Sequence, residues 1–432
     1  MSGPELPVEQ EPIGAAPPRA AGLIRRVALD LTPLRESPPF RRLFFGQGIS
    51  FIAGEVTWVA VPYQLFQLTH STLAVGLLYL TTLVPLLVAP IVGGAVADAV
   101  DRRRLLLASE AGFALVSVAL AVNATLPHPQ VWALYVLDFV GTLVFGFGTP
   151  SMRSLLPRIV EEEQLVAANA LESLYSNFAA VAGPAAGGLI IAGVGLTGTY
   201  LIDVASFGAS LASIWMLPPL PPSPEADRPS VRSIVEGFRY VRRQPVVLGI
   251  FLVDTNAMIF GMPMALFPAI GEHFGGGSKT VGFLFAAPYA GALVASIFSG
   301  PLAHIRRQGL GVLVAAAAWG AALVAFGYAN ALWLALAMLA VAGAADFVSA
   351  VLRSTIVLVA TPDAMRGRIT GIEFTQVAAA PTLGNVEAGV VASLTSLRFS
   401  IVSGGVACVA GCALLALAIP TLLRYDAKAA KA

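Results

Sequence analysis

Charged residues are scarce in this chain of 432 amino acids. Asp, Glu, Lys and Arg together make up 12% of it, about half their share in an ordinary soluble domain. Hydrophobic residues make up 57%, and the mean hydropathy is +0.79. This composition argues strongly against a soluble globular enzyme. The net charge of +1 creates no field that would attract nucleic acid, so we expect no nucleic-acid partner.

Cysteine is nearly absent as well. Cys408 and Cys412 lie one helical turn apart in an apolar run, which indicates inert packing rather than a disulfide framework or a metal site. The sequence also lacks a His-Glu-x-x-His motif, a Gly-x-Ser-x-Gly motif and a paired cysteine–histidine set. We therefore expect no metal, no cofactor and no enzymatic activity, and keep an intramembrane enzyme only as an alternative.

The chain contains instead a series of long apolar runs separated by short polar breaks. A helix needs about 20 mostly apolar residues to cross a bilayer, and this chain can supply twelve such helices. The pattern predicts an all-α polytopic membrane protein. The expected spans are residues 44–68, 73–97, 104–126, 131–150, 165–193, 197–217, 245–269, 280–303, 310–328, 332–354, 370–394 and 399–422.

The basic residues indicate how these spans are oriented. With twelve spans, every Lys and Arg falls on one side of the membrane except Lys279 and Arg398. Basic residues concentrate in cytoplasmic loops, so we expect a multi-pass protein of the cytoplasmic membrane with both termini in the cytoplasm.

Five regions follow from this arrangement. Residues 1–37 are rich in proline and predict a largely disordered cytoplasmic tail. Residues 38–217 and 245–422 are two six-helix halves, and residues 218–244 form a cytoplasmic linker that ends in a basic amphipathic segment. Residues 423–432 form a second cytoplasmic tail. Parallel six-helix repeats are typical of transporters that bind their substrate between the halves, near the middle of the membrane.

The loop after the second span carries a recognisable motif. Residues 94–104 read Gly-Ala-Val-Ala-Asp-Ala-Val-Asp-Arg-Arg-Arg, which resembles the signature loop of the major facilitator superfamily. Asp98 at a helix end can pair with arginine, so we expect a conformational latch between the halves. The alternative is that the arginines only fix the topology. The latch candidates are Gly94, Asp98, Arg102, Arg103 and, after the tenth span, Arg353.

The fifth span contains a second motif of this superfamily. Gly183, Pro184, Gly187 and Gly188 resemble its antiporter motif, which implies exchange and favours export. Small residues permit close helix contact and proline bends a helix. Ordinary packing of glycine in a membrane helix is the alternative.

A narrower resemblance covers about residues 30–420. His70–Thr72, Gly282–Ala287 and Thr361–Arg368 are similar to segments of the enterobactin exporter branch of the superfamily. The resemblance implies a proton-driven exporter of a siderophore or a similar amphipathic small molecule. The same branch includes macrolide and multidrug efflux pumps, so such a pump is the alternative, and a lysophospholipid flippase on the same fold is another.

Acidic residues inside the spans are the candidates for proton coupling. A charge in mid-bilayer costs a few kcal/mol, so each such residue needs a structural or functional reason. Glu55 lies near the middle of the first span, where burial favours the protonated form of a carboxyl, and it is the best candidate. The alternative for each is a structural hydrogen bond or ion pair. The candidates are Glu55, Asp138, Asp203, Asp254, Asp346 and Glu387.

Aromatic and amide side chains near these acids are candidates for lining the substrate cavity, although packing or anchoring at the membrane interface would explain any one of them. They are Trp58, Tyr63, Tyr175, Asn177, Asn256, Tyr289 and Gln376. The expected partners are a small amphipathic substrate, protons and the lipid bilayer, and we expect the protein to be a monomer.

Overall fold

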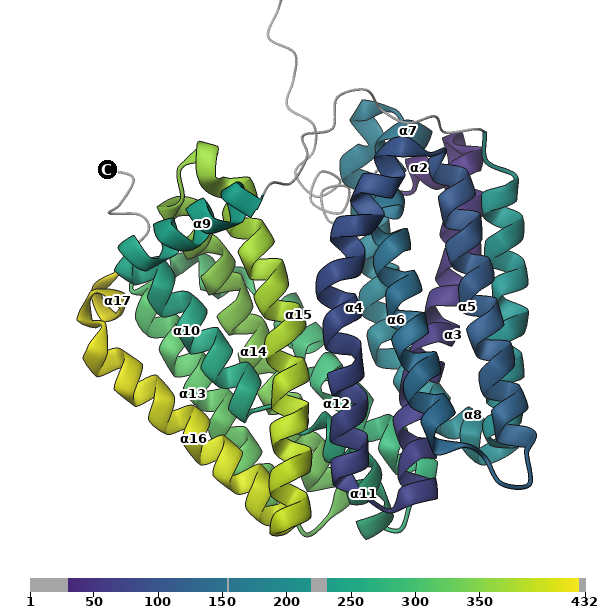
Figure 1. The fold of residues 1–432 in the computed structure, drawn as a ribbon. Helices are drawn as coiled ribbons and strands as arrows, with labels where there is room; N and C mark the ends of the chain where they lie inside the picture. Colours follow the sequence, from purple (N-terminus) through teal and green to yellow (C-terminus); the bar gives the residue numbers. More distant parts are fainter. Residues whose placement is uncertain (1–29, 154, 219–230, 427–432) are drawn as a thin grey trace, which may run out of the picture.

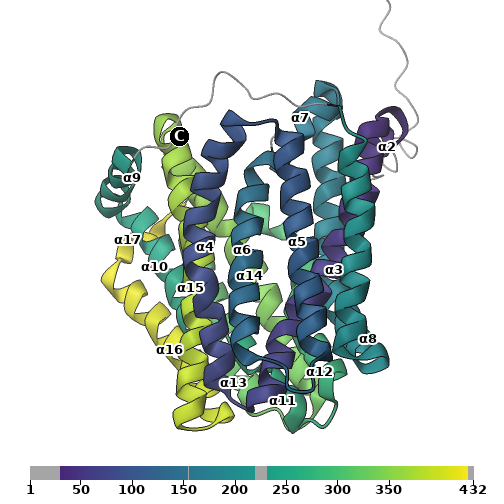
Figure 2. The same ribbon diagram turned by 45° about the vertical axis from the view of Figure 1, so that its right-hand side comes forward.

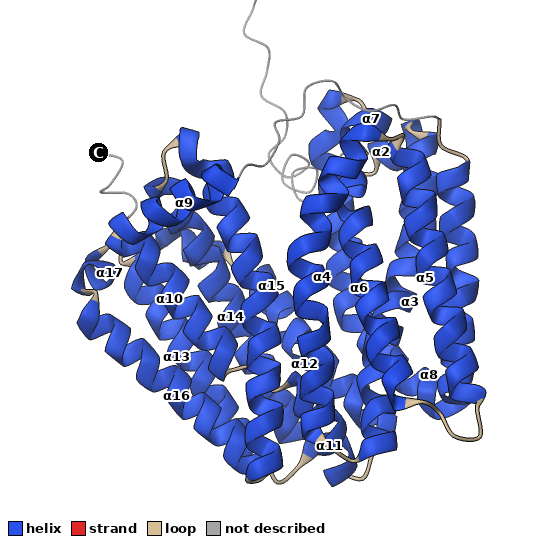
Figure 3. Ribbon diagram, viewed as in Figure 1, coloured by secondary structure: helices blue, strands red, loops and turns tan. Residues whose placement is uncertain are grey.

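The computed structural model describes residues 30–153, 155–218 and 231–426, and within these residues the secondary structure is entirely helical (Figure 3). The first half contains α2 (Thr32–Glu36), α3 (Pro38–Thr69), α4 (Thr72–Ala99), α5 (Arg102–Thr125), α6 (Val131–Arg153), α7 (Leu156–Ile159), η1 (Glu162–Gln164) and α8 (Leu165–Trp215). The second contains α9 (Val231–Arg243), α10 (Pro245–Phe260), η2 (Met264–Leu266), α11 (Phe267–His273), α12 (Gly277–Ile297), η3 (Gly300–His304), α13 (Gln308–Gly327), α14 (Leu332–Ala360), α15 (Asp363–Leu394), α16 (Leu397–Ala418) and α17 (Pro420–Arg424).

The prediction of twelve transmembrane helices is confirmed. Eleven segments of the described residues are long and apolar enough to cross a membrane. One of them contains α8, whose 51 residues would extend for about 77 Å as a single helix, more than twice the hydrocarbon thickness. Its helical path breaks at Gly195, with φ 72° and ψ 177°, a conformation that glycine adopts without a steric penalty. α8 is therefore two spans, which brings the total to twelve.

Side chains at the helix starts explain several of the boundaries. The hydroxyls of Ser37, Ser71 and Ser396 accept hydrogen bonds from backbone N–H groups three residues further on, at 3.1–3.2 Å. Asp101 does the same for Arg104 at 3.2 Å. Such N-caps satisfy amides that would otherwise lack partners.

Two sequence predictions need correction. Residues 1–29 of the expected disordered tail lie outside the described residues, but Thr32–Glu36 of that tail form α2. The seventh span, expected as one helix over residues 245–269, is interrupted at Gly261–Pro263 between α10 and α11. Side chains occupy this break: Trp319 Nε1 donates to the Gly261 carbonyl at 3.1 Å, and the Ala265 N–H donates to Asn385 Oδ1 at 2.8 Å. Non-helical backbone at membrane depth requires such partners.

The helices form two bundles that stand side by side (Figures 1 and 2). α2 to α8 make the N-terminal half and α9 to α17 make the C-terminal half. We call the end of the molecule that carries α2, α7 and α9 the α9 end, and the opposite end the α11 end.

Two glycine-lined seams join the halves near the α11 end. In the first, between α4 and α15, Thr72 Oγ1 donates to the Gly389 carbonyl at 3.2 Å, and a Cβ added to Gly76 would lie 3.3 Å from Gly389 Cα. In the second, between α8 and α12, Ser278 Oγ donates to the Gly188 carbonyl at 3.0 Å. A Cβ added to Gly188 would lie 2.9 Å from Gly282 Cα, so only glycine allows these backbones to approach so closely.

The α9 end is different. A Cβ added to Gly94 of α4, or to Gly367 or Gly371 of α15, would meet no atom within 4 Å. α4 and α15 therefore touch near their α11 ends and are not in contact around these glycines at the other end. In Figure 1 the two bundles diverge toward the α9 end.

We predict that Gly188→Ala weakens the second seam, because its Cβ would collide with backbone atoms of α12. Gly208→Ala, on the same helix α8, is the matched control, since its Cβ enters open space. Spin labels at the exposed positions His128 and Asn330, in loops of the two halves at the α11 end, would report the separation after Cys408 and Cys412 are replaced. We expect longer distances for Gly188→Ala only. Unchanged distances in both variants would contradict the assigned role of the seam.

Candidate functional site

A cavity of about 470 Å³ lies within the C-terminal half, between α10, α14 and α15. Most of its wall is apolar, and six of the described side chains with polar or charged ends line it. These are Asp254, Asp346, Arg353, Ser354, Glu373 and Gln376. A mostly apolar cavity with a few convergent polar groups has the character of a small-molecule site.

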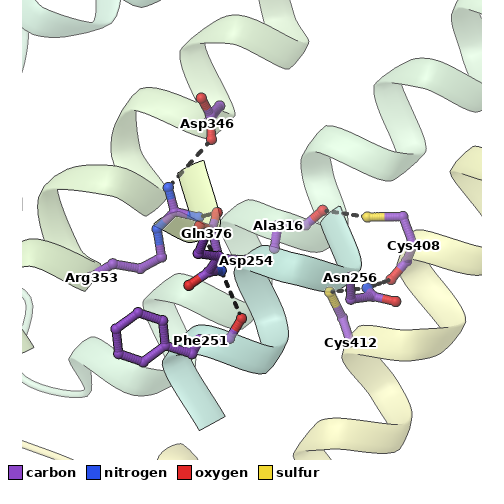
Figure 4. A network of polar contacts seen from close by, with 9 residues as sticks. All are labelled: Phe251, Asp254, Asn256, Ala316, Asp346, Arg353, Gln376, Cys408 and Cys412. Carbon is purple, nitrogen blue, oxygen red and sulfur yellow. Dashed lines mark hydrogen bonds and ion pairs between the residues drawn. The ribbon is translucent and has the colours of Figure 1, made fainter. Parts of the chain in front are cut away.

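Arg353 of α14 is at the centre of this polar cluster (Figure 4). Its guanidinium contacts the Asp254 carboxylate of α10 directly through Nη1, and its Nη2 lies 3.7 Å from Asp346 Oδ1. Asp346 and Arg353 are two turns apart on one face of α14, which brings them together as the sequence spacing indicates. Both ion pairs are within the C-terminal half, so in this conformation Arg353 is not part of a latch between the halves.

Gln376 of α15 joins the same cluster. Its Nε2 donates to the Phe251 carbonyl at 2.9 Å and to Asp254 Oδ2 at 3.1 Å. Glu373 precedes it by three residues on the same helix face and also lines the cavity. Gln376 was predicted to line the cavity, and Glu373 was not. The i, i+3 spacing between them places both on one helix face and could have indicated that Glu373 lines the cavity too.

The acids of the N-terminal half have different environments. Asp203 is 2% exposed, and its Oδ2 accepts hydrogen bonds from Thr57 at 2.8 Å and Ser117 at 2.7 Å. This arrangement ties α3, α5 and α8 together, as a structural carboxyl would. Asp138 of α6 is half-buried, and among the described residues its buried Oδ2 has no hydrogen-bond partner.

Glu55 lies where the two halves meet. It is at the middle of α3, and a Cβ on Gly183 of the antiporter motif would collide with its side chain. One turn further on, the Trp58 ring packs edge-on against Phe285 of α12, with centroids 5.3 Å apart. Among the described residues, no hydrogen bond or ion pair holds the Glu55 carboxylate.

The antiporter motif brings three helices together at this place. Gly183 and Gly187 of α8 face Glu55 and Val56 of α3, whereas Gly188 faces α12. The Pro184 carbonyl lies against Gly282 of α12. Tyr289 lies two turns after Gly282 on the same helix. We call this meeting point of the three helices the α3–α8–α12 junction.

The remaining cavity candidates are dispersed. The Tyr63 hydroxyl of α3 lies beside Gly277 of α12 near the α11 end, and the Tyr175 ring packs edge-on against Phe44 within the N-terminal half. Asn177 is exposed. Asn256 points away from the cavity, because its amide donates to the Cys408 carbonyl at 2.9 Å and contacts the Cys412 sulfur (Figure 4).

Two further sets of candidates lie outside this cluster. Glu387 borders a hollow of about 10 Å³ beside the break between α10 and α11. In the motif loop, Arg103 donates to the Trp215 carbonyl at the end of α8, and Arg102 is buried. The Asp98 side chain lies outside the described residues, so the latch stays a prediction.

We predict that Arg353 and Asp254 depend on each other for stability. Arg353→Gln leaves a buried carboxylate without its counter-charge, which costs on the order of 3 kcal/mol. Adding Asp254→Asn should recover part of that loss. Arg366→Gln, which removes an exposed pair with Asp363, is the control and should cost less than about 1 kcal/mol. Thermal unfolding of five purified proteins (native, Arg353→Gln, Asp254→Asn, the double variant and Arg366→Gln) measures the coupling, and purely additive losses in the double variant would refute it.

Comparison with known protein families shows which family the chain belongs to. The model of a family described as "Transmembrane secretion effector", a group of major facilitators, matches residues 28–431. The enterobactin exporter EntS of Shigella boydii serotype 18 is 32% identical over 344 residues, which cover 80% of this chain and 83% of that protein.

Solved structures of other transporters share the fold at low identity. A mutant of the nucleoside transporter NupG superposes with a TM-score of 0.71 at 11% identity and covers 89% of this chain and 99% of that one. A bacterial homologue of the lysosomal transporter Spinster, in an inward-facing and unoccupied conformation, gives a TM-score of 0.66 at 14% identity and covers 91% and 96%. With twelve spans in two six-helix bundles, the chain belongs to the transmembrane secretion effector family of the major facilitator superfamily and is a multi-pass membrane transporter.

Proposed function

We propose that this transporter is a proton-coupled antiporter that exports a siderophore or a similar amphipathic small molecule across the cytoplasmic membrane. The 32% identity to a protein named as an enterobactin exporter supports export of such a compound. The observation that supports the proton coupling is the position of Glu55 at the α3–α8–α12 junction, where no hydrogen bond or ion pair from the described residues holds its carboxylate.

The distribution of basic residues supports an orientation with the α9 end in the cytoplasm. The basic loops before α5, α10 and α13 are at that end, whereas Lys279 and Arg398 are at the α11 end. In this orientation the structure is inward-facing, with its glycine-lined seams closing the outer side.

Transport then follows from rocking of the two halves. Substrate enters from the cytoplasm and binds against the cavity wall of the C-terminal half. The seams open, the α9 end closes, and substrate leaves to the outside. The motif loop with Gly94, Asp98, Arg102 and Arg103 is placed to latch the α9 end in that second state.

Glu55 gives the proton a place in this cycle. Outside, protonation removes its charge and so lowers the cost of burying the side chain when the seams close again. The proton is released when Glu55 faces the cytoplasm. Each proton that crosses a potential of 100 mV contributes about 2.3 kcal/mol, so one or two protons can drive a substantial substrate gradient.

We predict that Glu55→Gln uncouples transport from protons while it preserves substrate exchange, because the amide keeps the shape of the side chain but cannot titrate. Everted vesicles, acidified inside, would be challenged in turn with catecholate siderophores, macrolides and cationic dyes. We expect one class to collapse the pH gradient with the native protein and to leave it intact with Glu55→Gln.

Asp363→Asn, at an exposed position of α15, and vesicles without the protein are the controls. Exchange of labelled for unlabelled substrate, which needs no net proton movement, should persist in Glu55→Gln. Normal export with an unchanged pH dependence in this variant would remove Glu55 from the mechanism.

A further inference from the structure

The cavity in the C-terminal half has an unequal number of acidic and basic groups. Asp254, Asp346 and Glu373 line it with carboxylates, and among the described residues of its wall Arg353 is the one basic side chain. The polar groups come from all three helices that enclose the cavity. The described part of the wall therefore carries more negative than positive charge, which favours a cation over an anion.

The carboxylate of Asp254 neutralises the positive charge of Arg353. The two side chains are in direct contact and are only 9% and 14% exposed. The other oxygen of Asp254 accepts the hydrogen bond from Gln376, so both of its oxygens are engaged within the protein. This pair is closed to a ligand.

Asp346 and Glu373 are then left as surplus acids. The Asp346 side chain is 38% exposed, and its contact with Arg353 is the longer one, at 3.7 Å. Glu373 is partly buried at the cavity wall and has no ion pair within 4 Å among the described residues. Because Arg353 is already neutralised by Asp254, both acids can accept a positive charge from a ligand.

The rest of the wall suits an apolar body attached to such a charge. Phe251 and Phe347 contribute aromatic rings, and Met258, Val351, Val357 and Val377 contribute aliphatic surface. An aromatic face adds attraction for a delocalised cation. A polyanion of the same size would meet two uncompensated carboxylates, and this repulsion makes its binding unfavourable.

We propose that this cavity is a subsite for a cationic group of an amphipathic substrate, with Asp346 and Glu373 as its counter-charges. The proposal rests on the proposed function and narrows it: the exported molecule carries an amine, a guanidine or a similar cation beside its apolar body. Binding of the cation displaces Arg353 from its long contact with Asp346 and leaves the Arg353–Asp254 pair in place.

Two ions of nearly identical size and opposite charge test this directly. Tetraphenylphosphonium and tetraphenylborate would be titrated separately into the full-length protein in nanodiscs of zwitterionic lipid. Calorimetry would measure the heat of binding, and the heat measured with empty nanodiscs would be subtracted. We expect saturable binding of the phosphonium and no saturable binding of the borate. Equal binding of both ions would overturn the proposal, since apolar contact alone would then explain it.

Variants locate the counter-charges. Asp346→Asn and Glu373→Gln should each weaken phosphonium binding at least tenfold, and Asp346→Glu should restore most of it. Asp363→Asn removes an exposed acid that lies ten residues before Glu373 on α15, and this variant should bind the phosphonium as the native protein does. Native affinity in both Asp346→Asn and Glu373→Gln would refute the site.

The binding assay tests the cationic subsite and the vesicle assay tests the proposed function, so each can be refuted without the other. Export of a neutral or anionic siderophore without phosphonium binding would refute the cationic subsite and would still support the proposed function. Saturable, acid-dependent phosphonium binding without transport of any compound would support the subsite and count against the exporter.

Discussion

The close approach of helix backbones at two glycine-lined seams is the constraint on which the rest of this structure depends. Gly76 and Gly389 allow α4 to touch α15, and Gly188 and Gly282 allow α8 to touch α12. Between helices in a membrane there is little hydrophobic driving force, so contact relies on small residues and short polar bonds. Because these contacts are near the α11 end, the halves are held together there, whereas the described glycines at the α9 ends of α4 and α15 make no contact between the halves.

The buried charges divide according to whether the protein itself supplies their partners. Asp203 and Asp254 are held by hydrogen bonds and by Arg353, so they join helices within one half. Glu55 and Asp346 are held less completely: among the described residues Glu55 has no hydrogen bond or ion pair, and Asp346 lies 3.7 Å from Arg353. In a medium of low dielectric constant, acids without full compensation are the ones whose energy changes most when a proton or a cation arrives. The acids that the protein itself holds therefore stabilise the helix packing, and the acids that it does not fully hold are the candidates for binding a proton or a cation.

Much of the fold could be predicted because lipid imposes a simple rule on length and hydropathy. The twelve spans and the two halves follow from it. The interruption at Gly261–Pro263 could not be predicted, since its apolar residues continue the hydropathy signal and its partners, Trp319 and Asn385, are distant in sequence. Arg353 was expected in a latch from its place after a span. Its actual partner, Asp254, is almost a hundred residues away, and only packing of α10 against α14 brings the two together.

The central claim is that the seams at the α11 end open in every transport cycle. His70 and Glu272 face each other across the halves there, with His70 Nδ1 3.8 Å from Glu272 Oε2 and both side chains exposed. In a protein without its native cysteines, His70→Cys and Glu272→Cys would be joined by a short, reducible bifunctional thiol reagent. Our account predicts that cross-linking stops transport and that reduction restores it. Undiminished transport by the cross-linked protein would contradict the account.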